Sequence, residues 1–168
     1  MLIYHPAYDI NHSIYRILLI LNSSVHKEFQ WDLLRLMDFY LLFPHLLKQI
    51  SPLPMTVKSY KKLINTLPDA YESMLNTKRI LFELEPIQNT AIQNIMAKDL
   101  IDLDKFQDGI VSRSDTALPD ELAGRLQADV IAGEEWFRFI TNELPALEFN
   151  GKSGLKQRSG LMEYKYDT

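Results

Sequence analysis

The most restrictive feature of this sequence is the stretch 29–43, which is apolar around nearly the whole circumference of a helix. Its charged residues Asp32, Arg35 and Asp38 follow one another three positions apart, so they form one narrow stripe. A helix that is apolar on its other sides belongs inside the fold. We therefore expect 29–43 to be the central helix, kinked or ended by Pro44, with ion pairs along the helix joining its charged residues.

The rest of the chain mainly predicts further helices around this one. Residues 1–11 are expected to be extended, because Pro6 disfavours a helix there. Pro86 is expected at the first position of a helix, where its missing N–H is not needed. Gly124 and Gly133 weaken the longest predicted helix by about 1 kcal/mol each relative to Ala. The expected helices are 12–21, 58–67, 79–84 (where a strand fits as well), 86–98 and 118–144.

A short hairpin is expected after the helix 86–98. Apolar and polar residues alternate in 100–103 and again in 110–113, and Asp108 and Gly109 between them form a turn signal. A helix, a tight turn, a second helix and a hairpin follow one another in a winged helix–turn–helix. We therefore predict a mainly α fold: a helical domain with a winged-helix-like segment, whose wing is the short β-hairpin, and an extended C-terminal tail.

The length of 168 residues fits one domain. We divide it into a helical, winged-helix-like part, 1–148, and an extended C-terminal segment of the same domain, 149–168. The chain has no cysteine, which excludes disulfides, thiolate metal sites and cysteine nucleophiles. The longest aromatic–aliphatic run, 39–43, is too short to span a bilayer, and the N-terminus does not resemble a signal peptide. We expect a cytoplasmic protein without membrane contact.

No residue pattern predicts catalysis. The sequence Asn-Gly-Lys-Ser at 150–153 resembles the end of a Walker A loop, but Ala146 stands where that motif requires glycine. The histidines, at positions 5, 12, 26 and 45, lack the spacing of a metal site. We therefore expect no enzymatic activity, no catalytic residues, no cofactor and no metal ligand.

The charge distribution argues against a dedicated DNA-binding protein. The net charge is −4, and residues 99–148 contain twelve acidic and four basic residues. The predicted recognition helix offers Gln88, Asn89, Gln93 and Asn94 to adenine edges, but Lys98 is its one cation. Phosphate contacts must position such a helix first, so we expect it to contact protein instead. Weak contacts with a DNA backbone are left to Lys58, Lys61, Lys62, Lys78 and Arg79.

The last residues, 151–168, combine three glycines with apolar and basic side chains. The glycines disfavour a long helix, so we expect an extended segment. Its leucines and tyrosines are too apolar for a disordered linker. The segment is expected either to pack on its own domain or to bind a partner, with its basic residues paired to acidic groups of that partner.

Several stretches resemble the middle component of ABC-three-component systems. They are 4–9 (YHPAYD), 36–44 (LMDFYLLFP), 84–88 (LEPIQ) and, most specifically, 151–167 (GKSGLKQRSGLMEYKYD). The resemblance covers nearly the whole chain. It implies a small non-catalytic subunit that works with an SMC- or RecN-like ABC ATPase and a variable effector, often a nuclease. Such systems include the Lamassu-type defence systems against phages and plasmids.

The resemblance implies that this subunit bridges or regulates the ATPase and the effector, with DNA contacted weakly or through the complex. The alternative is a winged-helix DNA-binding regulator. Co-elution with an ATPase favours the first interpretation, and a salt-dependent shift of duplex DNA at low protein concentration favours the second. The candidate partner-binding residues are Tyr4, His5, Pro6, Lys152, Gly154, Leu155, Lys156, Arg158, Gly160 and Leu161.

Overall fold

The computed structural model describes residues 6–70 and 76–167. In this part of the chain the α-helices are α1 (Ile10–Ser23), α2 (Trp31–Leu42), α3 (Lys61–Asn65), α4 (Thr77–Ala97), α5 (Leu103–Gln107), α6 (Asp120–Gln127), α7 (Glu135–Arg138) and α8 (Leu155–Ser159). Short 3₁₀ or π turns are η1 (Pro6–Tyr8), η2 (Pro44–Gln49), η3 (Met55–Tyr60), η4 (Val130–Gly133), η5 (Phe139–Glu143) and η6 (Leu144–Ala146). The strands are β1 (Glu28–Gln30) and β2 (Ile110–Ser112).

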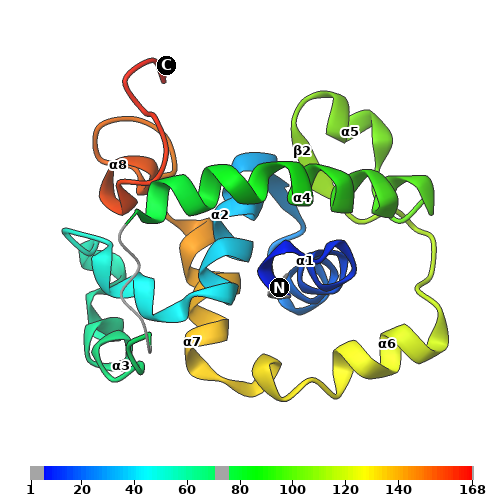
Figure 1. The fold of residues 1–168 in the computed structure, drawn as a ribbon, viewed down its shortest axis with the longest axis horizontal. Coiled ribbons are helices and arrows are strands. Elements are labelled where there is room, and N and C mark those ends of the chain that lie inside the picture. The colour runs from blue at the N-terminus through cyan, green and yellow to red at the C-terminus, as the bar shows by residue number, and fades with distance from the viewer. Residues whose placement is uncertain (1–5, 71–75, 168) are drawn as a thin grey trace, which may run out of the picture.

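Helices α1, α2 and α4 form the centre of the molecule. In Figure 1, α4 lies in the plane of the view and α1 is seen nearly along its axis below it, so the two helices cross steeply. Their packing against each other is the most extensive between any two described elements. The segment from α6 to η4 arcs around the opposite side of α1, α8 lies beside the start of α4, and α3 lies at the lower left of the view.

The prediction of a central helix is confirmed by α2. Eight of its twelve residues are buried, and Leu34, Leu36 and Phe39 have no exposed surface. The helix ends at Leu42, and Pro44 opens η2. It begins at Trp31 because the preceding residues belong to β1 instead.

The mainly α fold with a short two-stranded sheet is confirmed, but the sheet is not the expected hairpin. Strand β2 pairs antiparallel with β1, with Phe29 opposite Val111. Ile101 keeps one isolated bridge to Arg113. Asp102 explains the difference: its side chain accepts a hydrogen bond from the Lys105 N–H at 3.1 Å, which caps α5 and ends the extended segment.

The expected helix–turn–helix is not formed, because residues 77–97 make one helix, α4. Its buried residues keep helical spacing across Pro86, so both halves present one apolar face. Pro86 itself is exposed, and the loss of its N–H falls on the side where water is available. Pro86 is therefore inside a helix and not at the first position of a new one. The buried residues of α4 are Leu81, Leu84, Gln88, Ala91, Ile92 and Ile95.

The expected long helix 118–144 is wrong as well. The chain there is divided into α6, η4, α7, η5 and η6. Asp129 marks the first break, because its side chain accepts a hydrogen bond from the Ile131 N–H at 2.9 Å and starts η4. The longest described helix is α4.

Both ends of the chain differ from the extended structure expected there. Pro6 opens the turn η1, and α1 begins at Ile10 with Asp9 as its cap. The tail contains the short helix α8, which ends at Gly160 in a left-handed conformation with a φ of 67°. The residues after Gly160 form turns and bends, and the described part of the tail contains no strand.

The central position of α2 predicts how much stability is lost when one of its leucine side chains is truncated. Leu36→Ala removes a fully buried side chain, so the free energy of unfolding should fall by about 2–5 kcal/mol. Leu42 on the same helix is half-buried, so Leu42→Ala should cost less. Chemical denaturation of both variants and the wild type measures this. Equal, small losses for the two variants would contradict the assigned core.

Candidate functional site

A polar network lies where α1, α2 and α4 meet. Arg16 of α1 donates to Asp38 of α2 through two atoms, Nε to Oδ1 at 2.6 Å and Nη2 to Oδ2 at 3.2 Å. The Asp38 side chain has no exposed surface, and that of Arg16 is 10% exposed. A carboxylate this deeply buried is stable only when it is paired and hydrogen-bonded.

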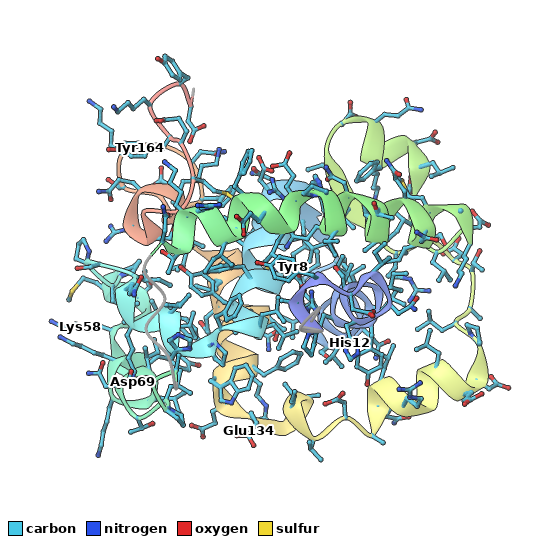
Figure 2. All side chains as sticks on the ribbon, in the orientation of Figure 1. Tyr8, His12, Lys58, Asp69, Glu134 and Tyr164 are labelled. Carbon is cyan, nitrogen blue, oxygen red and sulfur yellow. The ribbon has the colours of Figure 1, made fainter. Side chains whose placement is uncertain are left out.

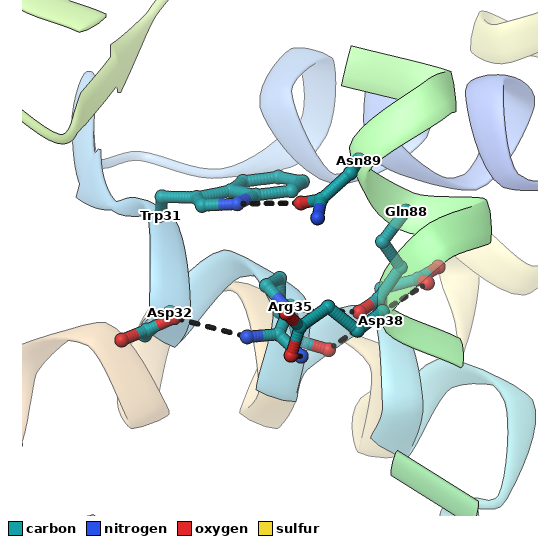
Figure 3. A network of polar contacts seen from close by, with 7 residues as sticks. Trp31, Asp32, Arg35, Asp38, Gln88 and Asn89 are labelled. Atoms are coloured by element: carbon teal, nitrogen blue, oxygen red, sulfur yellow. Dashed lines mark hydrogen bonds and ion pairs between the residues drawn. The ribbon is translucent and has the colours of Figure 1, made fainter. Parts of the chain in front are cut away.

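Gln88 of α4 provides a further hydrogen bond to Asp38. Its Nε2 donates to Asp38 Oδ2 at 2.9 Å and to the Arg35 carbonyl at 3.0 Å, while its Oε1 accepts from Arg35 Nε at 3.1 Å. Arg35 then reaches the surface, where it pairs with Asp32 at 3.1 Å and with Glu85 at 3.0 Å. Figure 3 shows this chain of contacts passing from α2 to α4.

This network corrects two predictions. The Arg35–Asp32 pair is the expected ion pair along the helix, but Asp38 pairs with α1 and α4 and not with its own helix. Gln88, a candidate contact residue on the outer face of the predicted recognition helix, is fully buried. Asn89 accepts a hydrogen bond from Trp31 Nε1 at 3.3 Å and faces the same junction (Figure 3).

The candidate residues in the tail mostly face their own domain. Leu155 and Leu161 belong to the hydrophobic core. Lys156 pairs with Asp167 at 3.0 Å and lies over the Phe149 ring, 5.1 Å from its centre. Gly154 is required by close packing, because a Cβ there would lie 2.2 Å from the Asn150 carbonyl oxygen.

Arg158 ties the tail to the loop 51–54. Its Nε donates to the Ser153 carbonyl at 2.6 Å, and its Nη1 donates to the Pro52 carbonyl. The Ser51 N–H in turn donates to the Arg158 carbonyl at 3.0 Å. Of the remaining candidates, Lys152 and Gly160 are exposed.

The other candidate residues lie on separate elements. Pro6 is exposed at the start of η1, and Tyr4 and His5 are outside the described residues. Lys58, Lys61 and Lys62 are exposed on η3 and α3, whereas Lys78 and Arg79 lie in the first turn of α4. Arg79 pairs with Glu83 at 2.8 Å.

The model of one protein family, described as ABC-three component (ABC-3C) system Middle Component 5, matches residues 2–167. The chain belongs to this family. Neither the comparison with curated proteins nor the comparison with solved structures found a match. The resemblance to an ABC-three-component middle component is thereby confirmed.

Two kinds of feature are absent from the described residues of this middle component. Within residues 6–70 and 76–167, no group of three or more histidine, aspartate or glutamate side chains is placed to hold a metal ion. In the same part of the chain, no helix combines the length and apolar character that crossing a membrane requires.

The Arg16–Asp38 pair in this middle component was not predicted, although the sequence contains a signal for it. Arg16 interrupts the apolar run of one helix, and Asp38 stands among apolar residues on another. When two helices are both buried and each contains one charge of opposite sign, pairing the two charges costs the least free energy. The periodicity of each helix does not show which helices become neighbours, so the partner could not be assigned.

We expect Asp38→Asn to be strongly destabilising, because it leaves the Arg16 guanidinium buried without a counter-ion. The loss in the free energy of unfolding should be about 3–5 kcal/mol. Replacing the pair by Arg16→Met with Asp38→Leu should recover most of it. Asp32→Asn is the control, since its surface ion pair should contribute less than about 1 kcal/mol. Urea denaturation distinguishes these cases, and a loss for Asp38→Asn as small as that of the control would refute the role of the pair.

The contacts of Asp167 in the tail predict that the thermal stability of the fold depends on pH. The Gly151 N–H, which donates at 3.0 Å, and then Lys156 lower the pKa of Asp167 below its ordinary 3.8. A lowered pKa in the folded state stabilises the fold above that ordinary value, and the gain disappears as the pH falls through the folded pKa. Asp167→Asn should therefore lower Tm at pH 7, with a difference that vanishes at acidic pH. Glu148→Gln, at an exposed residue, is the control and should leave Tm unchanged; a pH-independent deficit for Asp167→Asn would contradict the assignment.

Proposed function

We propose that this chain is the non-catalytic subunit that bridges or regulates an SMC- or RecN-like ABC ATPase and an effector subunit, a nuclease, in a Lamassu-type defence system. The observation that carries the proposal is the match of the Middle Component 5 family over residues 2–167, which makes the chain one part of a multi-component system. The proposed place of action is the cytoplasm.

The arrangement of polar groups supports a structural role. Each described partner of Asp38 belongs to α1 or α4, and the Arg35 guanidinium donates hydrogen bonds to residues of α2 and α4. Groups that are hydrogen-bonded in this way fix how the helices pack. A rigid helical body of this kind suits a subunit that works by contact with other proteins.

The arrangement gives less support to a winged-helix regulator that reads DNA. Gln88 is used inside the fold, and Asn89 is bonded to Trp31. Gln93 and Asn94 stay exposed on α4, but Lys98 is the cation that follows them, and the acidic segment 99–148 comes next. Phosphate neutralisation supplies most of the affinity of duplex binding, so we propose that DNA is contacted weakly or through the complex.

For the tail, we propose that a partner contacts its outer side. Leu155 and Leu161 are buried against the core, whereas Lys152 and Gly160 are exposed. Lys156 and Arg158 already hold Asp167 and the loop 51–54. Their contribution to a partner is then to keep the tail in shape.

The proposal predicts co-assembly without intrinsic activity. Expressed with the ABC ATPase and the effector of its own system, the chain should co-elute with the ATPase in gel filtration. Alone, it should neither hydrolyse ATP nor cleave DNA, and its affinity for short duplex DNA should stay in the non-specific range of about 10⁻⁴–10⁻⁶ M at physiological salt. Submicromolar duplex binding by the chain alone, together with separate elution from the ATPase, would establish the regulator instead.

A further inference from the structure

A groove of about 480 Å³ lies between η2, the loop 51–54, η3 and α3. Its floor is apolar, because the lining residues Leu47, Ile50 and Ile64 are core residues with at most 4% of their surface exposed. Met55 lines the same groove and is 78% exposed. An exposed methionine beside an apolar hollow is typical of a surface that binds another protein.

The rim of the groove carries positive charge that residues 6–70 and 76–167 neutralise only in part. Lys48, Lys58 and Lys61 all line it. Lys48 pairs with Asp69 at 2.7 Å, whereas Lys58 and Lys61 are exposed and form no ion pair with any residue in 6–70 or 76–167. Figure 2 shows Lys58 at the outer edge of the molecule, pointing away from the fold.

A second hollow, beside the first half of α4, differs from the groove in how its cations are paired. It is lined by three cations, Arg35, Lys78 and Lys156, and by the carboxylates Asp32, Glu85 and Glu163. Arg35 is paired with Asp32 and Glu85, and Lys156 with Asp167. Arg35 and Lys156 are therefore already paired within the chain. At the groove beside α3, Lys58 and Lys61 have no ion-pair partner among residues 6–70 and 76–167, and no carboxylate is among its lining residues.

The tail is hydrogen-bonded to one wall of the groove. The Arg158 guanidinium donates to the Pro52 carbonyl, and the Ser51 N–H donates to the Arg158 carbonyl at 3.0 Å. Ser51 and Pro52 form one wall of the groove. A wall fixed in advance lowers the ordering cost that a bound segment must overcome.

The chemistry of the groove selects its occupant. A phosphate backbone would pair with the lysines but would leave the apolar floor and Met55 without a partner. A peptide with an apolar side chain between carboxylates satisfies both, since the apolar group fills the hollow and the carboxylates meet the rim. We propose that this groove docks such an acidic, apolar-anchored segment of another component of the ABC-3C system. The inference rests on the proposed function, because it requires a partner protein in the complex.

The test places a photo-crosslinking amino acid at position 55 in the chain, assembled with the ATPase and effector of its system. In the Met55→benzoylphenylalanine variant, irradiation should crosslink position 55 to one segment of one of these components. Mass spectrometry should identify that segment as one in which carboxylates flank an apolar residue. The same substitution at Val25, 69% exposed and outside the groove, is the control and should not give that product.

A variant with two reversed charges measures how much the lysines at the rim contribute to the affinity for the complex. Lys58→Glu with Lys61→Glu should lower the affinity for the complex by about tenfold or more, with an unchanged Tm. Lys27→Glu with Lys98→Glu makes the same change of net charge at exposed lysines outside the groove, and should keep wild-type affinity.

The outcomes separate this inference from the proposed function. If the complex forms but position 55 crosslinks to nothing, to DNA or to a second copy of this chain, the docking proposal is overturned and the proposed function stands. Equal affinities for the two charge-reversed pairs would have the same meaning. If the wild-type chain does not assemble at all, the proposed function fails, and the groove proposal falls with it.

Discussion

The packing of α1, α2 and α4 depends on the burial of one carboxylate, that of Asp38. A charge without exposed surface must have its partners in place before the fold is stable, and those partners come from α1 and α4. Arg16 and Gln88 therefore fix the rotation of both helices against α2. The apolar contacts around them set how much surface is buried, whereas this network specifies one arrangement.

The same network links the centre of the fold to its surface. Gln88 bonds Arg35, whose guanidinium continues to Glu85 and Asp32. The tail lies beside this surface end of the network, because Lys156 and Leu161 line the same hollow as Asp32, Arg35 and Glu85. Leu155 and Leu161 belong to the core, and Arg158 binds the loop 51–54. The tail thus shapes the wall of the groove beside α3. Arg158 and the Pro52 carbonyl that it binds are 106 positions apart in the sequence.

Several elements could be predicted because their signals are local. The apolar circumference of 29–43 required a buried helix, and α2 is that helix. The alternation in 110–113 predicted a strand, which is β2. Where a side chain competes with periodicity, the prediction was wrong: Asp102 and Asp129 cap new turns, and Pro86 is accepted inside α4 because it lies on the exposed face. The groove beside α3 could not be predicted, because the lysines were visible in the sequence but the buried floor beneath them was not.

The sequence by itself determined the helical character of the chain, its central helix, the acidic segment 99–148 and the resemblance to an ABC-three-component middle component, because each of these depends on residue types at short separations. Only the tertiary structure decided that Asp38 pairs with Arg16, that β2 pairs with β1 and that the tail packs on its own core. These contacts join residues far apart in the chain. Periodicity shows which face of an element is buried, but the neighbour that covers the face is chosen by the packing of all elements together.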